Sequence, residues 1–122
     1  MSAANRSPKV APWQVWLVDF GHPIGHEQGG LRPAVVVGSP THCRFPIGMA
    51  LVVPLTTRDR GLEHHVRIDS AEAGLNRPSW ARTEEITAVS TQRFTRSAPL
   101  GAASDTEVTE LSEWLREMVA FS

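Results

Sequence analysis

Apolar residues in this chain gather in short runs separated by loops rich in glycine and proline. The runs contain many β-branched and aromatic residues, which predicts strands. Expected strands lie at residues 13–20, 34–37, 47–55 and 64–68, with one or two more within 79–89. Expected loops or turns lie at residues 21–33, 38–46, 58–63 and 71–78. Pro54 falls inside the third run, which indicates a sheet edge or a bulge near the end of that strand.

The end of the chain has a different pattern, in which apolar residues recur at helical spacing. This series consists of Val108, Leu111, Leu115 and Met118, with Trp114 and Phe121 beside it. Ser104 and Glu107 fit a capping box at its start. We expect an amphipathic helix of about four turns. Its solvent-exposed acidic face would carry Glu107, Glu110, Glu113 and Glu117.

Short strands, long loops and one terminal helix predict a mainly β fold. We expect a strongly bent antiparallel sheet, or a small SH3-like antiparallel β-barrel, with the C-terminal helix laid across it. A length of 122 residues corresponds to one domain. The expected organisation is a flexible arm over residues 1–12, followed by a single domain over residues 13–122.

The formal net charge of −1 averages two segments of opposite sign. Residues 104–122 carry five acids and one base, whereas the other 103 residues carry eleven bases and eight acids. Eleven of the twelve basic residues are arginines, whose planar guanidinium suits phosphate. The single cysteine, Cys43, excludes an intrachain disulfide and a cysteine-rich zinc site, and it fits a reducing, cytoplasmic setting. We find no signal-peptide core and no apolar run of membrane-spanning length.

The most informative stretch is GHEQGGLRPAVVV, residues 25–37. Its glycines allow the backbone to approach a ligand closely, and its polar residues are His26, Glu27, Gln28 and Arg32. From spacing alone, the simpler interpretation is a polar surface loop in which Arg32 pairs with Glu27.

This stretch resembles the signature of the MazF/PemK (Kid) toxin family, G-[SH]-E-Q-x-G-x-R-P followed by a run of valines. LVVPLTTRDRG, residues 51–61, resembles the family's V-x-P-[LVC]-T-[ST] strand and the loop after it. RTEEITAVSTQRF (residues 82–94) and WQVWLVDF (residues 13–20) resemble two further blocks. The resemblance extends over residues 13–120 and includes the C-terminal helix.

The resemblance implies a homodimer of the CcdB/PemK-like fold that acts as the toxin of a type II toxin–antitoxin system. It implies a sequence-specific endoribonuclease that cuts single-stranded RNA without a metal or cofactor and is neutralised by a cognate antitoxin. In that reaction the 2′-OH attacks the adjacent phosphate and leaves 5′-OH and cyclic phosphate ends.

Such a cleavage needs a base for the 2′-OH, donors for the phosphorane and an acid for the leaving 5′ oxygen. Arg32 and Thr56 are the expected phosphorane donors, and both match general family positions. The resemblance also implicates His26, Arg82 and Glu84. His26 would position or deprotonate the 2′-OH, Glu84 would act as base, and Arg82 would act as acid or phosphate clamp. The i,i+2 spacing of Arg82 and Glu84 places both on one face of a strand.

Four further residues are expected to bind RNA. Thr57 and Arg58 would contact the flanking backbone, while Glu27 and Gln28 would order the loop or bind a base. We expect no metal site. The nearest pair of ligands is His64 and His65, and adjacent strand residues point to opposite faces of a sheet.

The sequence departs from the family pattern at two places. Trp13-Gln14 replaces a G-[DE] pair before the first strand, and Glu84-Glu85 replaces D-Q. These departures leave two alternatives open. One is a CcdB-like, non-enzymatic toxin that binds gyrase, and the other is a catalytically decayed homologue that binds only RNA or an antitoxin.

Overall fold

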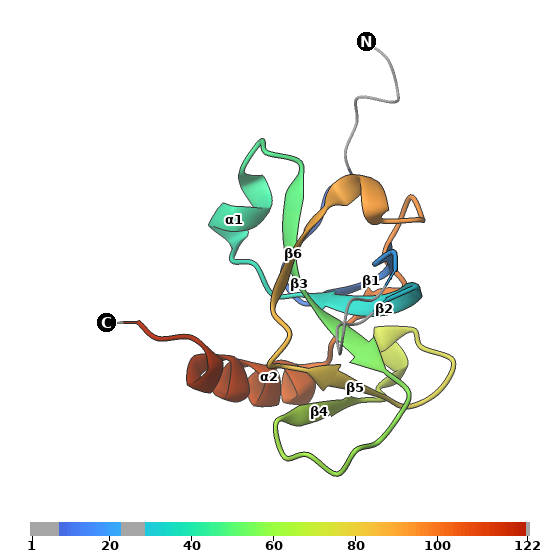
Figure 1. Ribbon diagram of the computed structural model, residues 1–122, viewed down its shortest axis with the longest axis vertical. Helices are drawn as coiled ribbons and strands as arrows, with labels where there is room; N and C mark the ends of the chain where they lie inside the picture. The colour runs from blue at the N-terminus through green and yellow to red at the C-terminus, as the bar shows by residue number, and fades with distance from the viewer. Residues whose placement is uncertain (1–7, 23–28, 122) are drawn as a thin grey trace.

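The computed structural model describes residues 8–22 and 29–121. Within these ranges a curled antiparallel sheet carries a C-terminal helix along one side (Figure 1). The strands are β1 (Gln14–Asp19), β2 (Leu31–Val36), β3 (Met49–Thr56), β4 (His65–Ile68), β5 (Ser79–Arg82), β6 (Thr87–Ser90) and β7 (Gly101–Ala102). The helices are α1 (Pro40–Arg44) and α2 (Asp105–Met118), with 3₁₀ turns η2 (Ala71–Ala73) and η3 (Thr91–Arg93). The predicted mainly β fold with a C-terminal helix is confirmed.

The long strand β3 lies at the centre of the sheet, whose order is β4-β5-β3-β2-β1-β7. One side of β3 pairs with β2, while the other pairs first with β6 and then, from Leu55 onward, with β5. Pro54 lies between the segments that pair with β6 and β5. Proline has no N–H to donate, so it is tolerated where β3 changes partner. The expectation that Pro54 marks an edge strand or bulge was therefore wrong.

Both faces of β3 are buried, which explains why its sequence is a continuous apolar run. Val53 and Leu55 belong to a cluster that includes Leu111 of α2. Ala50 and Val52 belong to a second cluster around Trp16 and Phe94, whose rings lie 5.1 Å apart. The complete members of the first cluster are Val15, Val35, Val53, Leu55, Val66, Ile68, Ala73, Ala81 and Leu111.

Two segments expected to be loops contain regular structure. Strand β2 begins at Leu31, so Arg32 and Pro33 belong to the sheet. Gly30, with φ of +73°, closes the neck of the preceding loop by accepting from Phe20 N (2.9 Å) and donating to Gly21 O (2.6 Å). The predicted loop at residues 38–46 contains the short helix α1, whose cap Ser39 accepts a hydrogen bond from His42 N. Within the described ranges, no helix is long and apolar enough to span a membrane.

The predicted capping box of the C-terminal helix is confirmed. Glu107 N donates to Ser104 Oγ at 3.2 Å, and Ser104 N donates to Glu107 Oε1 at 2.9 Å. The placement of Glu107 on the solvated face was wrong, because it is only 7% exposed. Its carboxylate also accepts from Asp69 N (2.8 Å), Ser70 N (3.1 Å) and Ser70 Oγ (2.7 Å). Phe121, expected beside the apolar face, lies beyond the helix end and is 78% exposed.

These bonds join the start of α2 to the segment after β4. Partial burial raises the pKa of Glu107, but hydrogen bonds from Ser104, Ser70 and Asp69 outweigh it, and the net pKa lies below the ordinary value. A carboxyl group with a depressed folded-state pKa stabilises the fold above its unfolded-state pKa of about 4.3. That stabilisation is lost as the pH falls through the folded-state pKa.

We therefore expect Glu107→Gln to lower the free energy of unfolding at pH 7 by about 2 kcal/mol. The wild type should lose stability more steeply than the variant below about pH 4, because only the wild type has this carboxyl group to protonate. Urea unfolding of both proteins across this pH range measures the difference. Glu110→Gln, on the exposed face of α2, is the matched control and should leave the stability at pH 7 nearly unchanged. Equal losses in the two variants would contradict the prediction.

Candidate active site

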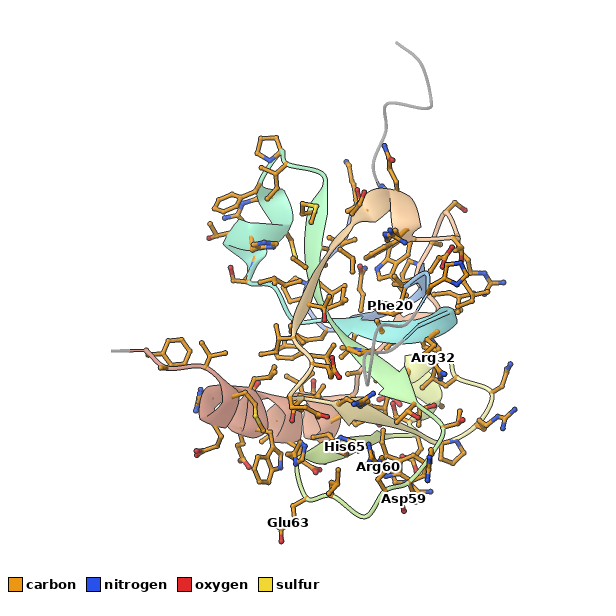
Figure 2. The ribbon with its side chains drawn as sticks, in the orientation of Figure 1. Phe20, Arg32, Asp59, Arg60, Glu63 and His65 are labelled. Carbon is orange, nitrogen blue, oxygen red and sulfur yellow. The ribbon has the colours of Figure 1, made fainter. Side chains whose placement is uncertain are left out.

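A cationic cleft of about 310 Å³ opens where the start of β2 meets the ends of β3 and β5. Its lining consists of four arginines and two threonines: Arg32, Thr56, Thr57, Arg58, Arg60 and Arg82. Figure 2 shows Arg32 and Arg60 on the side of the molecule away from the end of α2. Among the described residues no acidic side chain lines the cleft, so it attracts anions, and the arginine forks match the oxygens of phosphate.

Arg32 is held by its neighbours in a half-buried position. It is the second residue of β2 and lies opposite Val18 of β1. Its Nε donates to Gly29 O at 2.9 Å. A guanidinium has five N–H donors, and among the described residues this bond uses only the one on Nε, so both terminal nitrogens can meet a ligand.

Thr56 is the last residue of β3 and is nearly buried. Its Oγ1 accepts a hydrogen bond from Arg58 N at 3.1 Å. Since the hydroxyl accepts in this bond, its own hydrogen remains available to donate into the cleft. Pairing of Thr56 with Trp80 of β5 fixes the strand end. Thr57 and Arg58 follow directly and are exposed.

Arg82 reaches the cleft from the end of β5 and is 8% exposed. Its Nη2 donates to Glu85 Oε1 at 3.0 Å and to Glu84 Oε2 at 3.4 Å. Arg82 Nε is buried and finds no hydrogen-bond partner in the part of the chain that the structure describes. The two carboxylates therefore determine the position of this guanidinium, while it faces the cleft with its remaining donors.

Glu84 does not line the cleft and reaches it only through Arg82. Its carboxylate also meets His65 Nε2, at 3.1 Å from Oε1 and 3.3 Å from Oε2. Partial burial raises the pKa of Glu84, but hydrogen bonds from its own backbone and from His65, with the charge of Arg82, lower the pKa overall. A carboxylate with a lowered pKa is a weaker base, so its expected role as base stays a prediction.

The expectation that His64 and His65 point to opposite faces of a strand, which would keep them from binding one metal ion together, was wrong. His64 precedes β4 in a turn, so the alternation of a strand does not apply to it. The two rings lie 4.8 Å apart in a T-shaped arrangement, and His64 Nε2 is 3.2 Å from Glu84 Oε1. Figure 2 shows His65 at the start of β4.

The structure thus brings five of the residues predicted for the site into one cleft and adds one. Arg32, Thr56, Thr57, Arg58 and Arg82 line it. His26, Glu27 and Gln28 lie outside the described residues, so their roles stay predictions. The sequence interpretation missed Arg60. The signal for it was the i,i+2 spacing from Arg58 in a turn, where Asp59 folds back to accept from Gly61 N at 2.9 Å.

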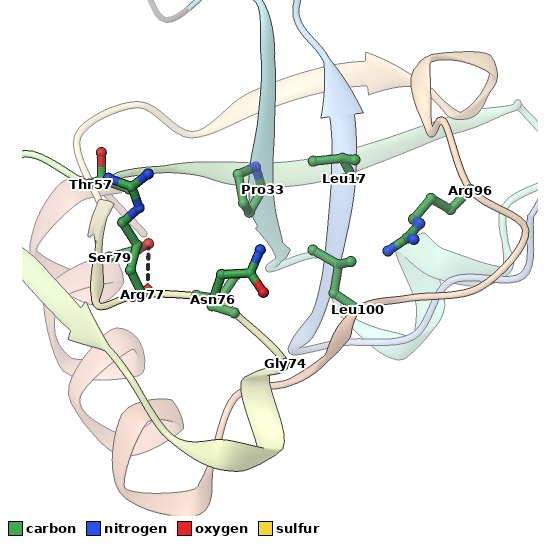
Figure 3. A pocket seen from close by; sticks show the side chains of 10 residues that line it. Leu17, Pro33, Thr57, Gly74, Asn76, Arg77, Ser79, Arg96 and Leu100 are labelled. Atoms are coloured by element: carbon green, nitrogen blue, oxygen red, sulfur yellow. Dashed lines mark hydrogen bonds between the residues drawn. The ribbon is translucent and has the colours of Figure 1, made fainter.

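A second hollow of about 380 Å³ adjoins the first through their shared residue Thr57. Figure 3 shows Arg96 opposite Asn76 and Arg77, across a floor that includes Leu17 and Pro33. Apolar floor and polar rim together suit a flat, partly polar group such as a nucleobase.

A family model described as PemK-like, MazF-like toxin of type II toxin–antitoxin system matches residues 11–119. The chain belongs to this family. The resemblance seen in the sequence motifs is thereby confirmed.

Curated relatives agree with this membership. The chain is 32% identical to endoribonuclease EndoA of Bacillus subtilis over 82 residues, which cover 66% of this chain and 71% of EndoA. It is 43% identical to the endoribonuclease toxin MazF of Escherichia coli K12 over 58 residues, 48% of this chain and 50% of MazF. The chain therefore spans about half the length of that MazF.

Solved structures show the same fold. MazF (Form-I) from Deinococcus radiodurans has a TM-score of 0.73 at 23% identity, covering 93% of this chain and 96% of the other. An endoribonuclease in complex with its cognate antitoxin from a mycobacterial species has a TM-score of 0.73 at 16% identity, covering 93% and 99%. The expected MazF-like architecture is confirmed.

The composition of the cleft predicts that Arg60 contributes to anion binding. Arg60→Ala should weaken the binding of inorganic pyrophosphate by about threefold to tenfold, because one exposed charge-assisted contact is worth about 1 kcal/mol. Isothermal titration at low ionic strength measures this affinity. Arg44→Ala removes an exposed arginine from α1, far from the cleft lining, and should have little effect. Equal weakening in both variants would show that only net charge matters.

Proposed function

We propose that this chain is the endoribonuclease toxin of a type II toxin–antitoxin system. The observation that carries the proposal is the cleft in which Arg32, Thr56 and Arg82 converge with further arginines. Two curated relatives named as endoribonucleases, EndoA and MazF, support the same activity.

The scissile phosphate binds in the cleft, with its non-bridging oxygens facing Arg32. As the 2′-OH attacks, the phosphorane gains negative charge, and the terminal nitrogens of Arg32 bind that charge. The bond from Arg32 Nε to Gly29 O holds the guanidinium in place beforehand, so little reorganisation is needed. The hydroxyl of Thr56 donates to the same phosphate, and Arg58 and Arg60 contact the flanking backbone.

Proton transfer falls to residues at the edge of the cleft. His26 positions or deprotonates the 2′-OH, since its ordinary pKa lies near neutrality. Glu84 is the second candidate for the base. With Glu84 as base, a protonated His26 gives its proton to the leaving 5′ oxygen; with His26 as base, the proton that it takes from the 2′-OH is returned to that oxygen. Arg82 acts as a phosphate clamp rather than as the acid, because a guanidinium keeps its proton in proteins. The nucleobase next to the scissile phosphate occupies the second hollow, which adjoins the cleft at Thr57.

We expect the purified chain to cleave mixed-sequence single-stranded RNA in the presence of EDTA, leaving 5′-OH and cyclic phosphate ends. Arg32→Ala should slow cleavage by about 10²- to 10³-fold, the usual loss when a transition-state donor is removed. Thr56→Val, nearly equal in volume, should lose about tenfold. Product-end mapping and single-turnover rates measure both effects, and Arg44→Ala serves as the control.

The same assay distinguishes the candidate bases. The variant of the residue that is the general base, His26→Asn or Glu84→Gln, should cleave RNA about 10²- to 10⁴-fold more slowly. Its affinity for RNA should be unchanged. If RNA stays intact at a high concentration of the wild-type chain, the proposed endoribonuclease activity is wrong. RNA binding without cleavage would indicate the catalytically decayed homologue, and trapped gyrase–DNA complexes would indicate the CcdB-like toxin.

The toxin assembles as a homodimer with a basic groove that an antitoxin blocks by inserting an acidic, apolar segment. An apolar hollow of about 550 Å³ supports self-association, because it lies beside the end of α2 and includes Trp13, Leu115 and the exposed Phe121. Solved relatives named as MazE–MazF and as an endoribonuclease with its cognate antitoxin support the antitoxin partner.

Sedimentation at micromolar concentration should therefore give the mass of a dimer. Phe121→Ser should shift the equilibrium toward the monomer, since it places a polar group on the apolar surface. Leu62→Ser changes an exposed leucine outside this hollow and is the matched control. A monomeric wild type at these concentrations would contradict the dimer.

A further inference from the structure

The end of the β4–β5 hairpin brings together three side chains that bind transition metals elsewhere in proteins. His64, His65 and Glu84 each offer one ligand atom, and these atoms all lie within 4.8 Å of one another. Both histidines present Nε2 to the same carboxylate oxygen, Glu84 Oε1, at 3.2 Å and 3.1 Å. Two imidazoles with one carboxylate form a donor set suited to zinc.

Two of the three distances between these atoms match those around a tetrahedral ion. Zinc–nitrogen and zinc–oxygen bonds of about 2.0–2.1 Å place neighbouring ligand atoms about 3.3 Å apart. Two edges of such a tetrahedron correspond to the contacts of Glu84 with His64 and His65. Small changes in the carboxylate torsion would let an ion enter between these atoms.

The charges around the cluster favour a cation. In the part of the chain that the structure describes, Arg82 is the only arginine within salt-bridge distance of Glu84. Arg82 forms two salt bridges, and the one with Glu84, at 3.4 Å, is longer than the one with Glu85. Glu85 meets Arg82 at 3.0 Å and so balances its charge. With neutral imidazoles, the two carboxylates and one guanidinium leave a net charge of −1 for a dication.

The backbone holds the three ligands on a rigid scaffold. His65 lies opposite Arg82 in the β4–β5 pairing, and its side chain is 1% exposed. Thr83 Oγ1 donates to His64 O at 2.6 Å, which ties the turn before β4 to the turn after β5. Trp114 of α2 packs edge-on to the His64 ring, with centroids 6.2 Å apart. The ligand positions are therefore set by packing before any ion binds.

We propose that His64, His65 and Glu84 form a binding site for one transition-metal dication of the zinc, cobalt or nickel class. Since the side chains of His64 and Glu84 are 27% and 34% exposed, solvent can reach the ion and supply a fourth ligand. The site shares Glu84 with the cleavage chemistry proposed above. That chemistry needs no metal, and metal binding is measured without RNA, so the two proposals are tested independently.

The affinity should be moderate. A ligating histidine usually donates its other ring N–H to an acceptor that fixes its orientation, and loss of such a partner weakens metal affinity by about 10- to 100-fold. His65 Nδ1 is buried and has no partner among the described residues. We therefore expect a dissociation constant in the micromolar range, well above that of closed structural zinc sites.

Isothermal titration of the full chain with zinc chloride should give one ion per chain. Cobalt chloride should produce the intense visible absorption of a four-coordinate cobalt ion bound to nitrogen and oxygen. His64→Ala and Glu84→Gln should each weaken zinc binding by about tenfold or more and abolish the cobalt absorption. Urea unfolding without metal verifies that each variant is folded, and neither change removes a fully buried side chain.

His22→Ala is the matched control, because it removes an exposed histidine outside the cluster. It should bind zinc as the wild type does. The proposal would be overturned if no zinc bound at about a hundredfold excess over the expected constant, if both cluster variants bound normally, or if His22→Ala alone lost binding. In the first case the two histidines would serve only as hydrogen-bond donors to Glu84. None of these results depends on whether the chain cleaves RNA.

Discussion

The shape of this molecule depends on a change of hydrogen-bonding partner along one strand. On one side β3 pairs with β2 through residues 52–54, but on its other side it leaves β6 and joins β5, with Pro54 at the change. A flat sheet would need a donor at that position, whereas a curled one has no ladder bond to lose there. The curl buries both faces of β3, one against α2 and one around Trp16 and Phe94. It also places the end of β3, with Thr56, beside the start of β2 and the end of β5.

The cleft depends on keeping the acidic side chains out of its lining. Asp59 lies between Arg58 and Arg60, yet its carboxylate turns back onto Gly61 N. Among the described residues, none of the acids of α2 lines the cleft. The near-zero net charge of the chain therefore combines a cationic cleft with a separate acidic helix. Electrostatic attraction of an RNA backbone needs this separation rather than a high total charge.

Apolar runs and the capping box predicted the strands and the C-terminal helix closely, because these patterns reflect burial and local hydrogen bonding. The start of β2 was missed because Gly30 and Pro33 are residues typical of loops. The positive φ of Gly30 serves the turn directly before the strand, and β2 begins at the next residue. Arg60 was missed because its i,i+2 spacing from Arg58 is a weak signal in a charged segment that has no pattern of buried residues. Glu107 was assigned to solvent because its partners, Asp69 and Ser70, are distant in sequence.

The His64–His65 pair shows the limit of reasoning from periodicity. Alternation of side chains holds inside a strand, and β4 begins only at His65. One residue earlier the backbone turns, so both imidazoles reach the same oxygen of Glu84. That carboxylate also contacts Arg82, which faces the cleft. The Arg82 guanidinium is thus positioned by a cluster at the end of the β4–β5 hairpin. Because Trp114 packs on His64, the packing of α2 against the sheet contributes to the geometry of the cleft.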